Sequence, residues 1–217
     1  FVDDITPYRT RKVRILNGAH TAMTPVAYLY GLETVDEATE HPVIGQYVKE
    51  LIYEEIIPTI NLPIQELHSF AKEVIDRFKN PFVEHFLMSI ALNSISKYKT
   101  RNLPTLLDYY QKNQILPKRL VFSFAALIEF YKGKRGEEPI NLADNLEIIN
   151  LFKDEWSNYK EDKEILENIV KNILGKESIW GSNLNEIPGL TLAVTDYLYE
   201  IETKGIREAV KGLIEGT

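Results

Sequence analysis

The sequence predicts a single all-α domain across residues 1–217. Apolar residues recur at helical spacing along most of the chain, and Pro, Gly or Asn bounds almost every such run. Runs that alternate apolar and polar residues between hairpin turns, which would indicate strands, are missing from the sequence. Because 217 residues can bury a sizeable core, we expect these helices to pack into one domain.

Two helices are expected near the start of the chain. The first should span Arg11 to Leu32, where apolar side chains share one face. Pro25 should kink this helix because proline lacks the N–H that the helical ladder needs, and Gly31 should end it. The second should span Val43 to Ile57 and stop at Pro58.

The helical pattern continues to the end of the chain. A third helix is expected from Pro63 to Phe78, and a fourth from Asn80-Pro81 through Leu92 or beyond. Asn80, directly before the proline, is interpreted as the cap of the fourth helix, which is a structural role. The stretch from Gly133 to Pro139 is predicted to be an exposed loop. Further helices are predicted over Leu103–Lys112, Leu116–Lys132, Leu142–Tyr159, Lys163–Leu174 and Gly205–Glu215.

The composition argues against several classes of function. The net charge of -7 disfavours nucleic-acid binding, which depends on clustered Lys and Arg. The absence of cysteine excludes disulfides, thiolate catalysis and Cys-ligated zinc, and it suits a reducing cytoplasm. No run approaches the roughly 20 apolar residues that span a bilayer, so no membrane partner is expected. His41, His68 and His85 lie far apart and no H-x-x-x-H pattern occurs, so no metal site is expected.

Three polar residues on the first predicted helix have the chemistry of an acid–base site. Lys12, Asn17 and His20 are spaced i, i+5 and i+8, which places them within an arc of roughly 140° on an α-helix. Oxidation of a secondary alcohol requires a base for the hydroxyl proton and hydrogen-bond donors for the developing alkoxide. Lys12 is therefore the candidate general acid/base, and Asn17 and His20 are candidates for holding the reacting oxygen.

Spacing alone does not establish this function. A Lys, an Asn and a His often share a helix face without any chemistry, and His20 by itself fits a hydrogen-bonded core histidine equally well. As a base, Lys12 must act in its neutral form, which burial and nearby cations such as Arg11 or Arg14 would favour.

The segment from Thr6 to Thr21 resembles a known family. Its K-x-x-x-x-N-x-x-H pattern at Lys12, Asn17 and His20 is the signature of the long-chain mannitol dehydrogenase family, and it is most similar to the tagaturonate reductase (altronate oxidoreductase) branch. The resemblance implies that Lys12 is the general acid/base, that Asn17 and His20 hold the reacting oxygen, and that the reaction uses NAD(P) without a metal ion. It extends over residues 52–58, 77–82 and 89–101.

The resemblance also implies the domain organisation. In this family a multihelical C-terminal domain of the 6-phosphogluconate-dehydrogenase-like kind follows a Rossmann-like domain that holds the nucleotide. No G-x-G-x-x-G or P-loop pattern occurs here, and the first residue is Phe rather than Met. We therefore expect the chain to be the C-terminal substrate-binding domain, with its own N-terminal Rossmann domain as partner, and to be inactive alone. Residues of this chain that contact NAD stay unassigned.

The basic cluster from Lys97 to Arg101 is a second candidate site. Such a cluster at the end of a helix is usually solvated and is favoured by the helix dipole. A sugar acid needs a cation for its carboxylate, however, and the family pattern implies a basic substrate contact near Lys97. Lys97 and then Arg101 are the predicted substrate-binding residues. Arg77 also matches the family pattern and is expected to pair with an acid at the domain interface.

The leading hypothesis is a cytoplasmic, NAD-dependent oxidoreductase of hexuronate metabolism that interconverts D-tagaturonate and D-altronate. Two alternatives have the same reaction chemistry but a different sugar acid or polyol as substrate. They are a fructuronate reductase and a mannitol-type polyol dehydrogenase. A helical interaction module without chemistry fits the charge and the helix content equally well. That alternative leaves the co-occurrence of Lys12, Asn17 and His20 without an explanation.

Overall fold

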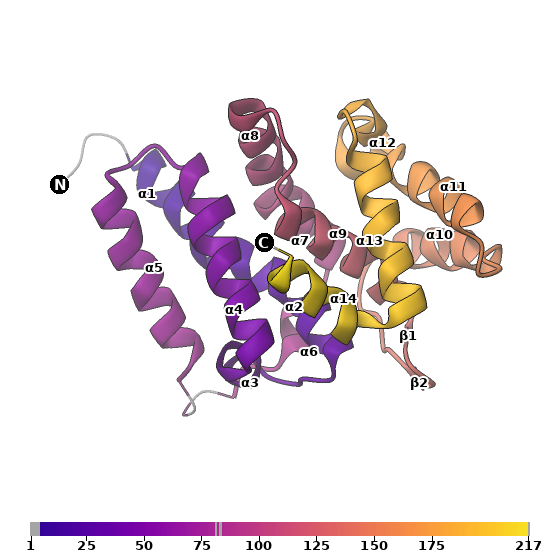
Figure 1. The fold of residues 1–217 in the computed structure, drawn as a ribbon, viewed down its shortest axis with the longest axis horizontal. Coiled ribbons are helices and arrows are strands. Elements are labelled where there is room, and N and C mark those ends of the chain that lie inside the picture. Colours follow the sequence, from indigo (N-terminus) through magenta and orange to yellow (C-terminus); the bar gives the residue numbers. More distant parts are fainter. Residues whose placement is uncertain (1–4, 81, 83, 217) are drawn as a thin grey trace.

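The computed structural model describes residues 5–80, 82 and 84–216, and helices dominate this part of the chain (Figure 1). Its only sheet is an antiparallel hairpin of Lys134–Arg135 (β1) and Glu138–Pro139 (β2), within the predicted exposed loop. The α-helices are α1 Thr6–Arg11, α2 Ala19–Tyr30, α3 Val35–Glu40, α4 Pro42–Glu50, α5 Ile64–Phe78, α6 Leu87–Ile90, α7 Ser94–Arg101, α8 Leu103–Asn113, α9 Lys118–Phe130, α10 Leu146–Ser157, α11 Lys163–Leu174, α12 Glu177–Trp180, α13 Leu190–Lys204 and α14 Ile206–Glu215. Two π-helical segments, η1 Lys12–Gly18 and η2 Leu51–Ile56, and two 3-10 turns, η3 Ile57–Thr59 and η4 Leu184–Glu186, complete the helical elements of these residues.

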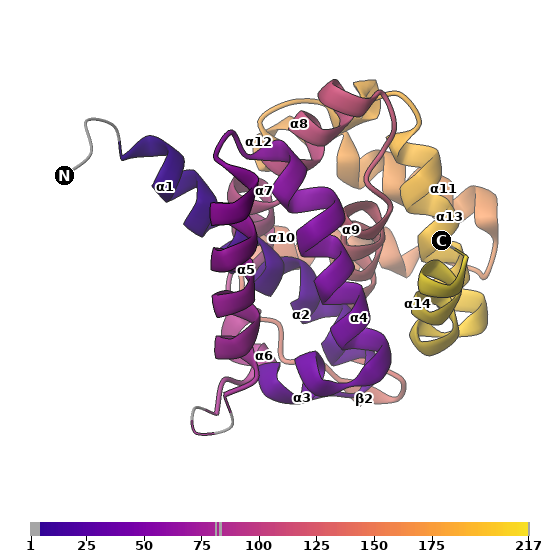
Figure 2. The ribbon, with the colours of Figure 1, turned by 60° about the vertical axis from the view of Figure 1, so that its left-hand side comes forward.

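Helix α9 is the centre of the core. All of its residues except Lys118 and Glu129 are buried, because its sequence is apolar on every side. It packs against α2 on one side and α13 on the other, and both views place it between these helices (Figures 1 and 2). Two buried tryptophans contact it: Trp156 donates its Nε1–H to the carbonyl of Ile128, and Trp180 meets the ring of Phe124.

The start of α9 is capped from a distant segment. Pro117, the residue before the helix, makes no capping hydrogen bond through its side chain. The buried carboxylate of Glu55 in η2 instead accepts hydrogen bonds from the backbone N–H groups of Arg119 (2.8 Å) and Leu120 (2.9 Å). Arg119 also forms ion pairs with Glu50 and Glu54, so a carboxylate-rich segment ties η2 to the core helix.

The predicted helix from Arg11 to Leu32 is confirmed in place, but it starts earlier and is not uniformly α-helical. α1, η1 and α2 run without a break from Thr6 to Tyr30, and η1 is a π-helix in which hydrogen bonds join residues i and i+5. Pro25 lies inside α2. Gly31 ends the helix, as predicted, in the left-handed conformation (φ 110°) that favours glycine.

The predicted helix from Asn80-Pro81 through Leu92 is wrong over the residues that the structure describes, which exclude Pro81 and Val83. Asn80 instead makes a turn, its side-chain oxygen accepting the N–H of Phe82 at 3.1 Å. Residues 85–87 pair in extended form with residues 33–35, where Val35 donates to the carbonyl of His85 and Leu87 donates to that of Glu33. This long-range pairing uses backbone groups that a helix would need, so only the short α6 follows.

The other helices differ from prediction mainly at their ends. α4 begins at Pro42, where His41 caps it through Nδ1, and the chain passes Pro58 within a 3-10 turn rather than stopping there. α10 begins at Leu146, where the side chain of Asn145 caps it, and not at residue 142. α3, α12 and α13 were not predicted, whereas α7 is the helix whose end carries the predicted basic cluster. Among the described helices, none combines the length and the apolar character that a membrane crossing requires.

Candidate active site

The three predicted acid–base residues come together in the structure. Lys12, Asn17 and His20 line one hollow of about 590 Å³, between the first helix and the C-terminal end of α5. The remaining lining residues are Leu16, Val35, Arg77, Phe78, Asn80 and His85. Polar groups are thus placed around an apolar wall, which is the usual make-up of a small-molecule site.

The π-helical segment accounts for this convergence. On an α-helix, residues five apart point about 140° away from each other. In η1 the hydrogen-bonded turn closes between residues i and i+5, so Lys12 and Asn17 lie one turn above each other on the same side. His20 follows on the first turn of α2 and completes the cluster. On an α-helix the three residues would spread over an arc of about 140°. The π-helical turn makes this arc narrower because it brings Lys12 and Asn17 to the same side.

His20 is enclosed by rings and remains neutral. Its imidazole stacks on Phe78 with centroids 4.0 Å apart and meets the edge of His85 at 5.1 Å. Burial, followed by the charges of His85, Arg101 and Arg77, lowers the pKa of His20 from 6.5 to about 3. Its Nε2 atom is buried and has no hydrogen-bond partner among the described residues. A substrate oxygen in the hollow would satisfy that atom.

Lys12 lies at the open side of the hollow, and its side chain is exposed. The two cations expected to act on it are both compensated by acids. Arg11 forms an ion pair with Glu66 of α5, and Arg14 forms one with Asp108 of α8. Each arginine therefore fastens the first helix to a neighbouring helix.

Sequence reasoning did not assign two further residues of this hollow. Arg77 was expected at the domain interface and His85 was treated as an isolated histidine, yet both line the site with Lys12. No acidic partner of Arg77 is found within the described part of the chain, so its guanidinium is available to an anion. The R-F-x-N-P match at residues 77–81 was the signal that could have brought Arg77 into the site, whereas His85 lies outside that match.

The structure does not place Lys97 and Arg101 in this hollow. Lys97 turns inward and donates from Nζ to the carbonyl of Ile90 at 2.8 Å. Arg101 donates to the hydroxyl of Thr21 at 3.1 Å and lines a separate, smaller hollow on another side of the first helix, together with Arg9. Their predicted substrate contact therefore has no support from the geometry of this chain.

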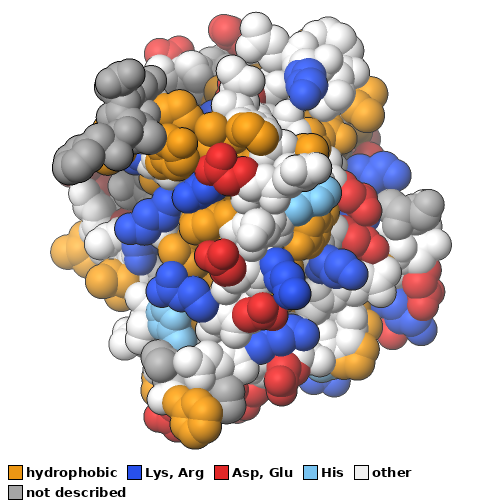
Figure 3. All heavy atoms as spheres, turned by 90° about the vertical axis from the view of Figure 1, so that its left-hand side faces the viewer, with side chains coloured by type: hydrophobic (Ala, Val, Ile, Leu, Met, Phe, Trp, Pro, Cys, Tyr) orange, Lys and Arg blue, Asp and Glu red, His pale blue; other side chains and the backbone are white. Residues whose placement is uncertain are grey.

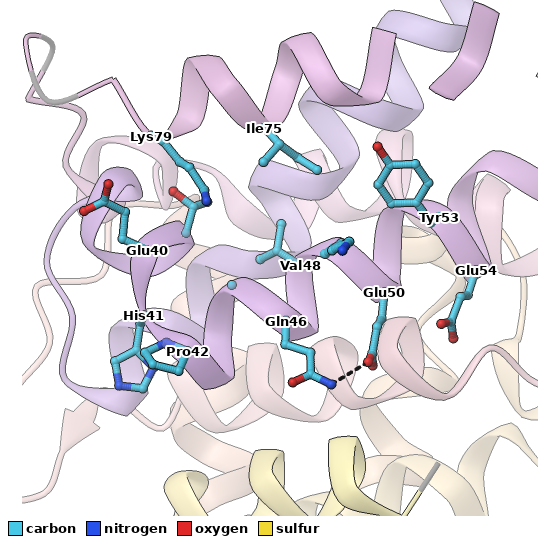
Figure 4. Close-up of a pocket in the computed structure, with 13 residues that line it drawn as sticks. Glu40, His41, Pro42, Gln46, Val48, Glu50, Tyr53, Glu54, Ile75 and Lys79 are labelled. Carbon is cyan, nitrogen blue, oxygen red and sulfur yellow. Dashed lines mark hydrogen bonds between the residues drawn. The ribbon is translucent and has the colours of Figure 1, made fainter. Parts of the chain in front are cut away.

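A second large hollow, of about 580 Å³, lies between α4 and α5 (Figure 4). It is lined by a mixture of acids and bases, including Glu40, Lys79 and Glu50, the last of which accepts a hydrogen bond from Gln46 at 2.8 Å. None of the predicted site residues lines it. Charges of both signs also alternate with apolar side chains across the side of the molecule that carries α1 and α5 (Figure 3).

Metal binding has no support in this site. Among residues 5–80, 82 and 84–216, no group of three or more His, Asp or Glu side chains could hold a metal ion. The polar side chains around the hollow are a lysine, two amides, two imidazoles and an arginine. This set suits a polar organic substrate with a negative charge.

Comparisons with known proteins relate the sequence of this chain to one family. Residues 4–202 match the family model described as "Mannitol dehydrogenase C-terminal domain". The altronate oxidoreductase of Bacillus subtilis (strain 168) is 50% identical over 210 residues, which cover 97% of this chain and 42% of that protein. The altronate oxidoreductase of Phocaeicola vulgatus is 46% identical over 216 residues, or 99% of this chain and 44% of that protein. This chain therefore spans less than half the length of these relatives.

Solved structures show the same fold. The Pseudomonas fluorescens mannitol 2-dehydrogenase, a ternary complex with NAD and D-mannitol, matches with a TM-score of 0.87 at 22% identity, over 100% of this chain and 42% of that one. A D-sorbitol dehydrogenase in substrate-free form matches with a TM-score of 0.74 at 21% identity, over 96% and 41% of the two chains. With nearly its whole length matched by the family model, the chain belongs to the mannitol dehydrogenase family, as a C-terminal domain of that family.

Proposed function

We propose that this chain is the substrate-binding and acid–base half of an NAD-dependent oxidoreductase that interconverts D-tagaturonate and D-altronate. The observation that carries the proposal is the meeting of Lys12, Asn17 and His20 in one hollow with the guanidinium of Arg77, which has no acidic partner among the described residues. The relatives named altronate oxidoreductase, at 50% and 46% identity, support the choice of substrate. A cytoplasmic location and an N-terminal nucleotide-binding partner domain are part of the same proposal.

The proton chemistry belongs to Lys12. In the reducing direction its ammonium group gives a proton to the carbonyl oxygen as that oxygen gains negative charge, and in the oxidising direction neutral Lys12 removes the hydroxyl proton. The Asn17 amide can donate two hydrogen bonds, and neutral His20 can donate one. Both are held on the same side as Lys12 and steady the oxygen while its charge changes.

The residues present fit a cofactor that another domain holds. The sequence contains no Gly-rich phosphate-binding turn, and Lys12 is exposed at the open side of the hollow, where a second domain has access. When bound there, NAD would supply the hydride exchange at the substrate carbon. The role of this chain is to orient the substrate carbon toward that open side.

Arg77 gives the site its preference for an acid. Its guanidinium suits bidentate binding of a carboxylate, and it reaches the hollow from the end of α5, across from Lys12 on the first helix. A sugar acid bound between them would have its keto group at Lys12 and its carboxylate at Arg77. A polyol such as mannitol has hydroxyl groups but no carboxylate to pair with this cation.

The test is NADH oxidation by the complete enzyme with tagaturonate, fructuronate and fructose. We expect the highest kcat/KM with tagaturonate. A preference for fructuronate would keep the acid–base roles and change the substrate, whereas a preference for fructose would also remove the carboxylate role of Arg77. No activity with any of the three would refute the proposed substrate class.

A matched pair of variants tests Arg77 separately. Loss of a charge-assisted hydrogen-bonded pair costs about 1.5–3 kcal/mol, so Arg77→Gln should raise the KM for tagaturonate about tenfold to 100-fold. Lys79→Gln removes a charge two residues away, in the other hollow, and should leave KM unchanged. Equal KM values in the two variants would show that Arg77 does not bind the carboxylate.

A further inference from the structure

The π-helical turn that carries Lys12 and Asn17 needs support from the rest of the fold. π-Helical geometry is rare and occurs mostly as short interruptions within α-helices. If η1 relaxed to an α-helix, Lys12 and Asn17 would point about 140° apart and would no longer face one hollow. The contacts that hold η1 in its register therefore decide whether the acid–base residues meet.

The junction between α7 and α8 makes the first such contact. Asn102 is 1% exposed, and its Nδ2 donates to the carbonyl oxygen of Gly18, the last residue of η1, at 2.9 Å. The junction lies close to this turn, since a Cβ atom on Gly18 would be 3.6 Å from the carbonyl oxygen of Arg101. A side chain longer than that of alanine at residue 18 would hold the junction away.

The neighbouring residue makes the second contact through a relay. The Arg101 guanidinium donates to the hydroxyl oxygen of Thr21 at 3.1 Å, and that hydroxyl donates to the backbone carbonyl of Asn17 at 2.9 Å. Thr21 is 3% exposed, so the relay is shielded from competing water. Arg101 thus reaches the backbone of a site residue without lining the site itself.

We propose that Arg101 and Asn102 are positioning residues, which clamp η1 in its π-helical register by holding the backbone carbonyls of Asn17 and Gly18. The assignment gives the basic cluster at the end of α7 a role that differs from substrate binding. The effect that we expect on catalysis rests on the proposed function. The effect that we expect on the structure of η1 rests on backbone hydrogen bonding alone.

The test compares variants that remove only hydroxyl or amide groups in the complete enzyme. Thr21→Val removes the hydroxyl relay at similar volume, and Thr21→Ser keeps it. Asn102→Leu removes the amide donor. Thr195→Val is the matched control, because the buried hydroxyl of Thr195 donates to the carbonyl four residues before it at 2.8 Å, within α13 and away from the site.

Two readouts separate the clamp from a general structural role. A small misplacement of reacting groups costs up to about 100-fold in rate, so Thr21→Val and Asn102→Leu should lower kcat about tenfold to 100-fold while the KM for NADH stays unchanged. Thr21→Ser and Thr195→Val should stay within about threefold of the wild-type kcat. Hydrogen exchange over residues 12–23 should accelerate in Thr21→Val and Asn102→Leu only.

The outcomes are distinguishable. If Thr21→Val and Asn102→Leu keep both the wild-type kcat and the wild-type exchange rates, the clamp is refuted, while the proposed function stands. If Thr195→Val lowers kcat as much as Thr21→Val, the effect is general stability and the clamp is again refuted. If Lys12→Ala itself keeps full activity, the proposed function fails, and the exchange rates alone decide the clamp. Should Asn102→Leu fail to fold, Thr21→Val against Thr21→Ser carries the test.

Discussion

The clearest stability prediction concerns Glu55, which caps the central helix from a distance. Its carboxylate is 2% exposed and accepts the backbone N–H groups of Arg119 and Leu120 at the start of α9. Glu55→Ala removes both acceptors, and Pro117 makes no side-chain cap to replace them. Two buried N–H donors are then left without partners.

The magnitude follows from these contacts. A buried donor without a partner costs about 1–3 kcal/mol, and loss of a helix cap by itself costs about 0.5–2 kcal/mol. Arg119 keeps its ion pair with Glu50, so its charge is not left uncompensated. We therefore expect Glu55→Ala to lower the free energy of unfolding by about 3–5 kcal/mol.

Glu54→Ala is the matched control. The neighbouring Glu54 also pairs with Arg119, at 3.1 Å, but its side chain is 58% exposed. Exposed ion pairs contribute about 0–1 kcal/mol, so this variant should be almost as stable as the wild type. Urea unfolding followed by tryptophan fluorescence is the assay, because both tryptophans contact α9. If Glu55→Ala costs no more than Glu54→Ala, the capping argument is wrong.

Two further predictions concern pH and packing. The pKa of His20 is lowered to about 3, below the 6.5 of an unfolded histidine, so its ring should stay neutral in NMR titrations from pH 8 to 5. Its contribution to stability should be lost as the pH falls from 6.5 toward 3, because the unfolded chain then binds the proton more readily. An NMR titration midpoint of His20 near 6.5 would contradict its burial. Gly45→Ala should lower the free energy of unfolding by about 1–3 kcal/mol, because a Cβ atom there would overlap the carbonyl oxygen of Thr39. Gly18→Ala, whose Cβ would make only ordinary contacts, should be tolerated; equal losses in the two variants, measured by urea unfolding, would refute this reasoning.

The sequence predicts the amphipathic helices best. α11 was predicted over Lys163–Leu174 and is found there, because its apolar face is regular, Asp162 caps its start and Gly175 follows its end. α13 was missed although its buried apolar residues, Leu190, Val194, Leu198 and Ile201, keep helical spacing. Thr195 is also fully buried and satisfies its hydroxyl within its own helix, which no hydropathy pattern reveals.

Features that depend on distant contacts could not be predicted. The π-helical register of η1 places Lys12 and Asn17 on one side, yet the residues that contact its backbone lie more than 80 positions along the chain, as the hydrogen bond from Asn102 to Gly18 shows. The extended pairing of residues 33–35 with 85–87 likewise replaces a helix that local preference favours.

The candidate site was predicted only in part. The spacing of Lys12, Asn17 and His20 and their family signature identified one wall of the hollow. Arg77 and His85 form the opposite side and reach it only through the packing of α5 and the turn after it. Lys97 and Arg101 were chosen for their charge and for the family pattern near Lys97, and their role in substrate binding stays a prediction. Their side chains donate to a carbonyl and a hydroxyl of this chain.

The central claim is that Lys12 is the proton donor and acceptor of the reaction. The most direct measurement is the rate of NADH oxidation with tagaturonate by the complete Lys12→Ala enzyme, together with NADH binding followed by its fluorescence. We expect turnover to disappear while NADH binding stays near the wild-type level, because the proposed N-terminal domain would hold most of the nucleotide. Lys12→Arg should behave alike, since a guanidinium keeps the charge but does not release a proton. Turnover within tenfold of the wild type in Lys12→Ala would contradict the account.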